Sequence, residues 1–141
     1  MRVPARGDDA GAAAVEFALV SVLLFTVFFG IIQYGYYFLQ SSGAEHAAWV
    51  GARAAAVGID DCATWQQLVK DSGGSADVQT ATALRDPSAG PMVRGDAIRI
   101  RVTWERVDFG LPFVPFLGAS AQTEEALTRA ERMGSVTTGC P

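Results

Sequence analysis

One apolar run near the N-terminus limits what this chain can fold into more than any other feature. Residues 17–32 contain no charged side chain, and the window 12–32 contains only one, Glu16. A helix needs about 20 residues to cross the roughly 30 Å hydrocarbon core of a bilayer. We therefore expect one helix over residues 12–58 that crosses a membrane with its first half and continues beyond it.

The single acid in this run requires an explanation. A carboxylate deep in hydrocarbon costs about 2.5–3.5 kcal/mol on insertion scales, so an acid there is a candidate for a functional role. Two interpretations of Glu16 stay open: it pairs with a positive group, or it extends toward the lipid head groups near the helix start.

The basic residues predict the orientation of the span. Arg2 and Arg6 precede it, and Arg53 lies well past its other end. Because Arg and Lys near a span set its direction, we expect a cytoplasmic N-terminus and an extracytoplasmic C-terminal domain. A secretory signal peptide and an uncleaved signal anchor are alternatives, although a signal peptide has an apolar core of only about 7–15 residues.

Beyond the span the helix becomes rich in small residues. An aromatic belt is expected first, where hydrocarbon meets the outer head groups, from Gln33, Tyr34, Tyr36 and Tyr37. Two rows of small residues then follow at four-residue spacing: Ala44, Ala48, Ala52 and Ala56, and Ala47, Gly51 and Ala55. Such rows admit close approach of another element, which is either the chain's own sheet, the interpretation we favour, or another subunit's helix. Trp49 and Val57 are expected to add bulk to this packing, and Gly58 to end the helix as a left-handed cap.

Residues 59–141 are long enough for one small domain. A short helix is expected at residues 62–69, capped by Asp60 and Asp61, with Trp65, Leu68 and Val69 toward the core. A strand is expected at residues 77–84, with Val78, Thr80, Thr82 and Leu84 on one face. The clearest strand alternates Ile98, Ile100, Val102 and Trp104 with Arg99, Arg101, Thr103 and Glu105, which predicts one buried and one wet face.

The last third of this domain contains a segment that fits two kinds of secondary structure. Residues 119–132 suit a helix by propensity and a closing strand by position, and we choose the strand. The predicted fold class is therefore α+β, with a three-stranded antiparallel sheet packed on the long helix. The apolar loop 111–117 contains two prolines and either covers the core or offers a patch to a partner.

The two cysteines, Cys62 and Cys140, form an even pair without CxxC spacing on the far side of a membrane span. This pattern favours a disulfide over a metal site. The bridge would close a long loop and add about 4–5 kcal/mol in the simplest chain-entropy model. Two independent free thiols are the alternative.

Composition and motifs exclude several classes of function. The net charge of −4 argues against nucleic-acid binding, which needs a basic patch. The single histidine, His46, has no metal ligands at helical spacing, and the two Arg-Gly-Asp triplets, residues 6–8 and 94–96, suit a leader and a turn better than an adhesion site. No catalytic, cofactor-binding or metal-ligating set is visible, so we expect neither an enzyme nor a cofactor.

Residues 11–17, GAAAVEF, resemble the processing site of Flp-type (Tad) pilins and pseudopilins: a glycine, four residues, then glutamate and an aromatic residue. The blocks EFAL, GIIQYG and GARAA resemble successive parts of the TadE-like domain, so the resemblance covers residues 7–57. Two departures occur. Many family members have a proline where this chain has Ser21-Val22, and an acid where it has Gln33.

The resemblance implies a type IV pilin-like minor pseudopilin that helps initiate or assemble a Flp-type pilus, since major subunits of such pili are thought to be little more than the helix. A prepilin peptidase would cut after Gly11, remove the cytoplasmic leader 1–11 and leave Ala12 as the new terminus. The amine of a neighbouring subunit would then pair with Glu16, and Glu16 and Phe17 would set the register of assembly. The implied partners are membrane lipid, other pilin and pseudopilin subunits and an inner-membrane assembly platform. No nucleic-acid partner is implied.

The implied location is the bacterial cytoplasmic membrane, as a single-pass protein with incorporation into a surface pilus. The alternative is a single-pass, membrane-anchored binding or sensor protein with an extracytoplasmic domain.

Overall fold

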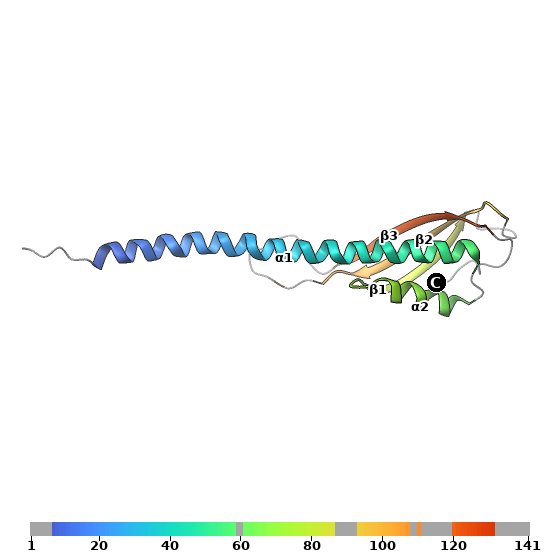
Figure 1. Cartoon of the computed structure of the whole chain (residues 1–141), viewed down its shortest axis with the longest axis horizontal. Coiled ribbons are helices and arrows are strands. Elements are labelled where there is room, and N and C mark those ends of the chain that lie inside the picture. The colour runs from blue at the N-terminus through green and yellow to red at the C-terminus, as the bar shows by residue number, and fades with distance from the viewer. Residues whose placement is uncertain (1–6, 59–60, 87–92, 108–109, 111–119, 132–141) are drawn as a thin grey trace, which may run out of the picture.

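The computed structural model describes residues 7–58, 61–86, 93–107, 110 and 120–131. It contains two helices and three strands, in the order α1 (Gly7–Val57), α2 (Cys62–Ser72), β1 (Asp77–Asp86), β2 (Ala97–Glu105) and β3 (Ala121–Arg129). Figure 1 shows α1 running the length of the molecule, with α2 and the sheet gathered around its C-terminal part. The strands form one antiparallel sheet in the order β1-β2-β3. The predicted α+β fold is confirmed.

The long helix begins before the predicted cleavage site and ends where predicted. In the uncut chain it starts at Gly7, and residues 7–11 contain no proline that would prevent this start. The boundary at residue 12 is the predicted cleavage site and stays a prediction. At the other end Gly58 has φ +93°, and its N–H donates to the carbonyl oxygens of Ala54 (3.2 Å) and Ala55 (3.3 Å). The predicted left-handed cap is confirmed.

The helix continues without interruption through Ser21-Val22, where the resemblance described above would suggest a proline. The Ser21 hydroxyl donates to the carbonyl of Ala18 at 2.9 Å, and the Thr26 hydroxyl donates to that of Val22 at 2.8 Å. Hydroxyls in an apolar segment need such internal acceptors. This part of α1 therefore satisfies its own polar groups without a kink.

The predicted alternation of β2 is confirmed. Its inward side chains, Ile98, Ile100, Val102 and Trp104, are fully buried, whereas Arg99, Arg101 and Glu105 are exposed. β3 is also confirmed as a strand. Its Glu125 accepts a hydrogen bond from Arg101 at 2.9 Å and its Ala126 is buried, so pairing with β2 overrides the helical propensity of the segment.

The predicted face of β1 is wrong. The register against β2 shifts between Val78 and Thr80, and this bulge turns the following residues to the opposite face. Val78 therefore shares the core with Ala81 and Ala83. Leu84, expected on the same face as Val78, is 45% exposed.

The small residues of α1 form the centre of the core. Ala44, Ala47, Ala48, Ala52 and Ala55 are all at most 2% exposed and pack against α2 and the sheet. A Cβ added at Gly51 would lie 2.8 Å from Val69 Cγ2, and Trp65 Nε1 donates to the Gly51 carbonyl at 3.1 Å. The small rows are thus occupied by the chain's own domain, which is the interpretation favoured from the sequence.

The second helix is positioned by its cap. Asp61 accepts hydrogen bonds from the backbone N–H groups of Thr64 (3.0 Å) and Ala63 (3.3 Å). These bonds and one from the Thr64 hydroxyl, which is the largest cause, lower the pKa of the Asp61 carboxyl. Trp65 and Val69 point inward as predicted, but Leu68 is 43% exposed.

Candidate functional site

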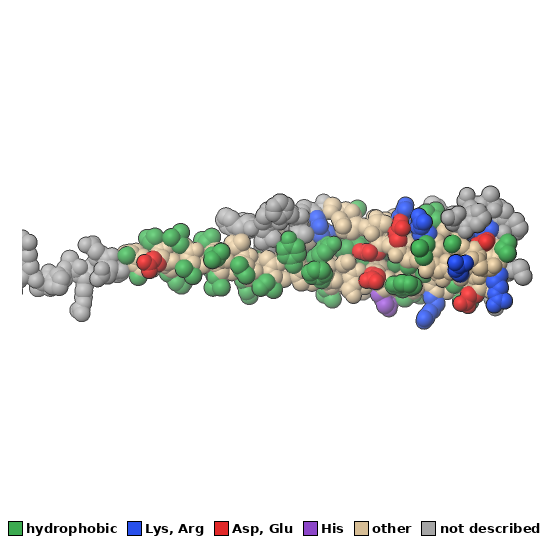
Figure 2. Space-filling view, turned by 90° about the horizontal axis from the view of Figure 1, so that it is seen from above, with side chains coloured by type: hydrophobic (Ala, Val, Ile, Leu, Met, Phe, Trp, Pro, Cys, Tyr) green, Lys and Arg blue, Asp and Glu red, His purple; other side chains and the backbone are tan. Residues whose placement is uncertain are grey.

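The first half of α1 carries large apolar side chains that no described element covers. In residues 12–32, which we call the bare half, they are 37–75% exposed, and Figure 2 shows them distributed along the thin end of the molecule. This helix is long and apolar enough to cross a membrane, and its most apolar window is not buried within the protein. The bare half therefore needs lipid or other helices around it, and it supports a single-pass membrane anchor.

The predicted processing and register residues all lie on this half. Gly11, Ala12, Glu16 and Phe17 are exposed, and a Cβ at Gly11 would meet nothing within 4 Å. Glycine in a helix interior costs about 0.5–1 kcal/mol relative to alanine, so the helix is less stable at this point than it would be with alanine. Residue 11 is both accessible and locally weak.

Glu16 has no ion-pair or hydrogen-bond partner among the described residues. The next basic residue along the chain is Arg53, and at 1.5 Å per residue it lies roughly 55 Å farther along the helix. A cation that pairs with Glu16 must therefore come from the N-terminal end of a chain, from lipid or from another molecule.

Two buried glutamines join α1 to the end of β2. Gln33 Nε2 donates to the Val107 carbonyl at 3.5 Å, and the Val107 N–H donates to Gln40 Oε1 at 3.4 Å. Gln33 is only 3% exposed, so its predicted place in an aromatic belt facing the head groups is wrong. Tyr34 is 44% exposed, as a belt residue would be.

The same junction brings two aromatic rings together at a tilted angle. Tyr37 lies 6.0 Å from Trp104, between ring centroids, and the Arg106 guanidinium lies 5.8 Å from the Tyr37 ring. Gln33 Oε1, Gln40 Nε2 and Trp104 Nε1 are buried and have no hydrogen-bond partner among the described residues. The burial of Gln33 and Gln40 was not predictable from the sequence, because glutamine is usually a surface residue.

The structure describes only one of the two cysteines of the predicted disulfide. Cys62 begins α2 and packs, partly buried, against the core, whereas Cys140 lies outside the described residues. The Cys62–Cys140 bridge stays a prediction. The apolar loop 111–117 lies outside the described residues as well, and so does Arg6 of the first Arg-Gly-Asp triplet. Gly7 and Asp8 of that triplet begin α1.

The second Arg-Gly-Asp triplet is a structural turn. The Asp96 carboxylate accepts from the Val93 N–H at 2.8 Å and pairs with Arg85 at 2.6 Å. The bond from Val93 and, next, the pairing with Arg85 lower the pKa of the Asp96 carboxyl, against an opposing effect of burial. An aspartate engaged in this way is not presented for adhesion.

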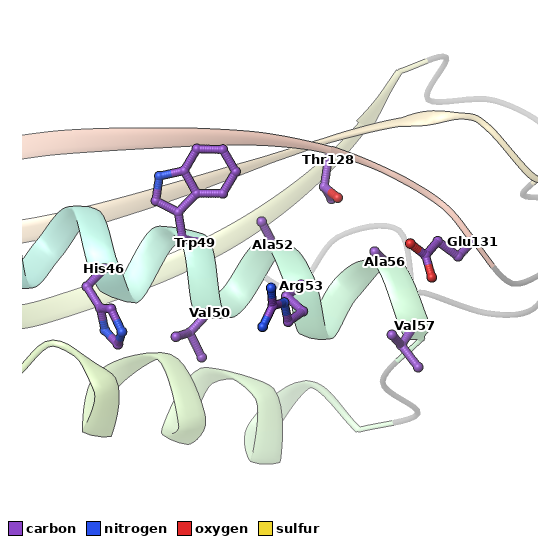
Figure 3. A pocket seen from close by; sticks show the side chains of 9 residues that line it. All are labelled: His46, Trp49, Val50, Ala52, Arg53, Ala56, Val57, Thr128 and Glu131. Atoms are coloured by element: carbon purple, nitrogen blue, oxygen red, sulfur yellow. The ribbon is translucent and has the colours of Figure 1, made fainter.

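A groove that the sequence did not predict lies beside the exposed face of α1. It has a volume of about 660 Å³, and Figure 3 shows its lining: His46, Trp49, Val50, Ala52, Arg53, Ala56, Val57, Thr128 and Glu131. Trp49 is 57% exposed and Val57 is 49% exposed, so the expectation that they add bulk to the core is wrong. A helical wheel would have placed Trp49 opposite Ala47 and Gly51.

No group of three or more potential metal ligands occurs among the described residues. His46 Nδ1 lies 3.2 Å from the Ser72 carbonyl oxygen, which joins α1 to the end of α2. We find no arrangement in the described part of the chain that would perform catalysis.

The comparison with protein families matches the helix that carries these features. A family model described as TadE-like protein matches residues 11–53, which confirms the resemblance inferred from the sequence and associates the chain with the Tad pilus system. Neither the curated proteins nor the solved structures contain a match to this chain.

Proposed function

We propose that this chain is a minor pseudopilin that helps initiate or assemble a Flp-type pilus and is processed by a prepilin peptidase after Gly11. One observation carries the proposal: a bare apolar half-helix with a single unpaired carboxylate five residues after a glycine, inside the segment that matches the TadE-like family.

Cleavage would create the cation that Glu16 lacks. The new ammonium at Ala12 would be four residues from Glu16, or about 6 Å along the same face of the helix, and it would be available both to its own glutamate and to the Glu16 of a neighbouring subunit. In an apolar surrounding an unpaired carboxylate is costly and a hydrogen-bonded ion pair is tolerated. The pair would therefore fix the axial register of adjacent helices.

The head, which comprises α2, the sheet and residues 43–58 of α1, supports a minor role. Major subunits of such pili are thought to be little more than the helix. A subunit with an added domain would place a different surface at the end of an assembly, which suits a minor subunit. Because Ala44, Ala48 and Ala52 are buried in the head, its position follows that of α1. In this proposal the N-terminus is cytoplasmic, the head is extracytoplasmic, and the partners are the peptidase, sibling pilins and pseudopilins, and the inner-membrane assembly platform.

Intact-mass measurement of the membrane-bound protein tests processing. A mature terminus at Ala12 is expected in cells that contain the peptidase, and Gly11→Ala should leave the precursor uncut. Gly30→Ala is the matched control, since a Cβ at Gly30 also meets nothing within 4 Å, and it should be processed normally.

A wild-type protein that keeps residues 1–11 in such cells would contradict the proposal and favour the membrane-anchored binding protein instead. We also propose the Cys62–Cys140 bridge. The same mass measurement, made after alkylation with and without reductant, distinguishes it from two free thiols.

A further inference from the structure

Above the bare half, one face of α1 is left uncovered by the head. The side chains on it are all exposed and recur at three- or four-residue spacing, which places them on one side of the helix. We call them the outer stripe: Phe38, Ser42, Glu45, His46, Trp49, Arg53 and Val57. The core alanines Ala44, Ala47 and Ala55 lie on the opposite side of the helix.

The outer stripe carries two opposite charges around one tryptophan. Glu45 is four residues before Trp49, and Arg53 is four residues after it. Neither charge has an ion-pair partner among the described residues. They are eight residues apart, or about 12 Å along the same helix, and cannot reach each other.

A second copy anchored in the same membrane lies parallel to the first, and this constrains how two outer stripes can meet. Without an axial shift, each Glu45 would face the other copy's Glu45 and each Arg53 the other's Arg53, which is repulsive. A shift of eight residues, about 12 Å, brings Glu45 of the raised copy level with Arg53 of the lower one. We propose that the outer stripe docks a second copy of this chain in this shifted, parallel register.

Side-chain sizes fit the same shift. Ser42 of the raised copy becomes level with Val50 of the lower copy, so a small residue lies beside the lower Trp49. Trp49 of the raised copy becomes level with Val57 of the lower copy, at the groove of about 660 Å³. The buried alanines Ala52 and Ala56 line that groove, and they leave room for the indole ring.

The inference requires the membrane anchor and not the proposed function. It depends neither on cleavage after Gly11 nor on entry into a pilus. Its test can therefore use the uncut Gly11→Ala protein in membranes, so that failure of docking and failure of processing are seen separately.

Charge reversal tests the ion pair across the interface. In chemical cross-linking of the full-length protein in membranes, Glu45→Arg and Arg53→Glu should each reduce the dimer about threefold to fivefold, as expected for an exposed pair. The double variant Glu45→Arg/Arg53→Glu should restore it. Glu105→Arg, on an exposed position of β2, is the control and should leave the dimer unchanged.

Directed cross-links test the register. Copies that carry Ser42→Cys and copies that carry Val50→Cys should form mixed disulfide dimers more readily than either forms with itself. The tryptophans give an independent readout, because Trp65 and Trp104 are buried and Trp49 is 57% exposed. Acrylamide quenching of the fluorescence should fall as dimer forms, and Trp49→Phe should remove that change.

Three results would overturn the inference. The first is a double variant Glu45→Arg/Arg53→Glu that forms as little cross-linked dimer as the single variants. The second is a preference of Ser42→Cys copies to form disulfides with each other, which would indicate an unshifted register. The third is cross-linking through the outer stripe to a different pilin subunit with no dimer of this chain.

Discussion

The two halves of α1 belong to one uninterrupted helix but differ in what packs against them. The bare half is built from phenylalanine, leucine and valine, and its large side chains remain exposed, such as Phe17 at 75%. The upper half is built from alanine and glycine, and residues such as Ala44 and Ala47 are fully buried.

Bulky side chains cover the helix backbone and suit lipid or neighbouring helices, whereas small ones admit a sheet and a second helix to the backbone. Side-chain volume, more than hydrophobicity, therefore separates the anchor from the core.

The largest expected effect is on the bare half. Glu16→Gln keeps the size of the side chain but removes its charge, and we expect it to abolish pilus assembly, measured by electron microscopy and by recovery of the protein in sheared fibres. The head should keep its fold, because Glu16 contacts none of its described residues. Normal piliation in this variant would remove the proposed role of the carboxylate.

Paired glycine substitutions test the comparison directly. Gly51→Ala in the upper half places a Cβ 2.8 Å from Val69 Cγ2 and 3.3 Å from the Trp65 ring, and such overpacking costs about 1–3 kcal/mol. Gly30→Ala in the bare half meets open space and should not destabilise the protein. Thermal unfolding in detergent, followed by the near-ultraviolet signal of the buried tryptophans, should show a lower Tm only for Gly51→Ala. Equal effects of the two substitutions would mean that the halves do not differ as described.

A smaller effect is expected from acid, and only in the head. Because the pKa of Asp96 is lowered by the Val93 N–H and by Arg85, its ionised form stabilises the fold above its unfolded-state pKa of about 3.9. That contribution is lost as the pH falls through the lower folded-state pKa.

Asp96→Asn should therefore be less stable than wild type at neutral pH and converge with it in strong acid, in urea titrations at several pH values. The helical signal of the bare half should not respond. A stability difference independent of pH would show that the charge of Asp96 is not the cause.

Residues close together in the sequence determined much of this protein. The length of the apolar run predicted the anchor, and the glycine after the last residue of α1 predicted the helix cap at Gly58. The alternation from Ile98 to Glu105 predicted the buried and exposed faces of β2. The motif Gly11 to Phe17 predicted the family resemblance. These features depend on residues a few positions apart, so that a period or a spacing is sufficient to find them.

Only the tertiary structure decided the rest. The bulge in β1 moved Leu84 out of the core, pairing with β2 made residues 121–129 a strand, and Gln33 and Gln40 became buried against Val107. Trp49 remained exposed because the sheet and α2 occupy the opposite side of α1. The physical reason is common to all four: each depends on contacts with residues far away in the chain, and local propensity carries no information about which of two available faces a distant element will cover.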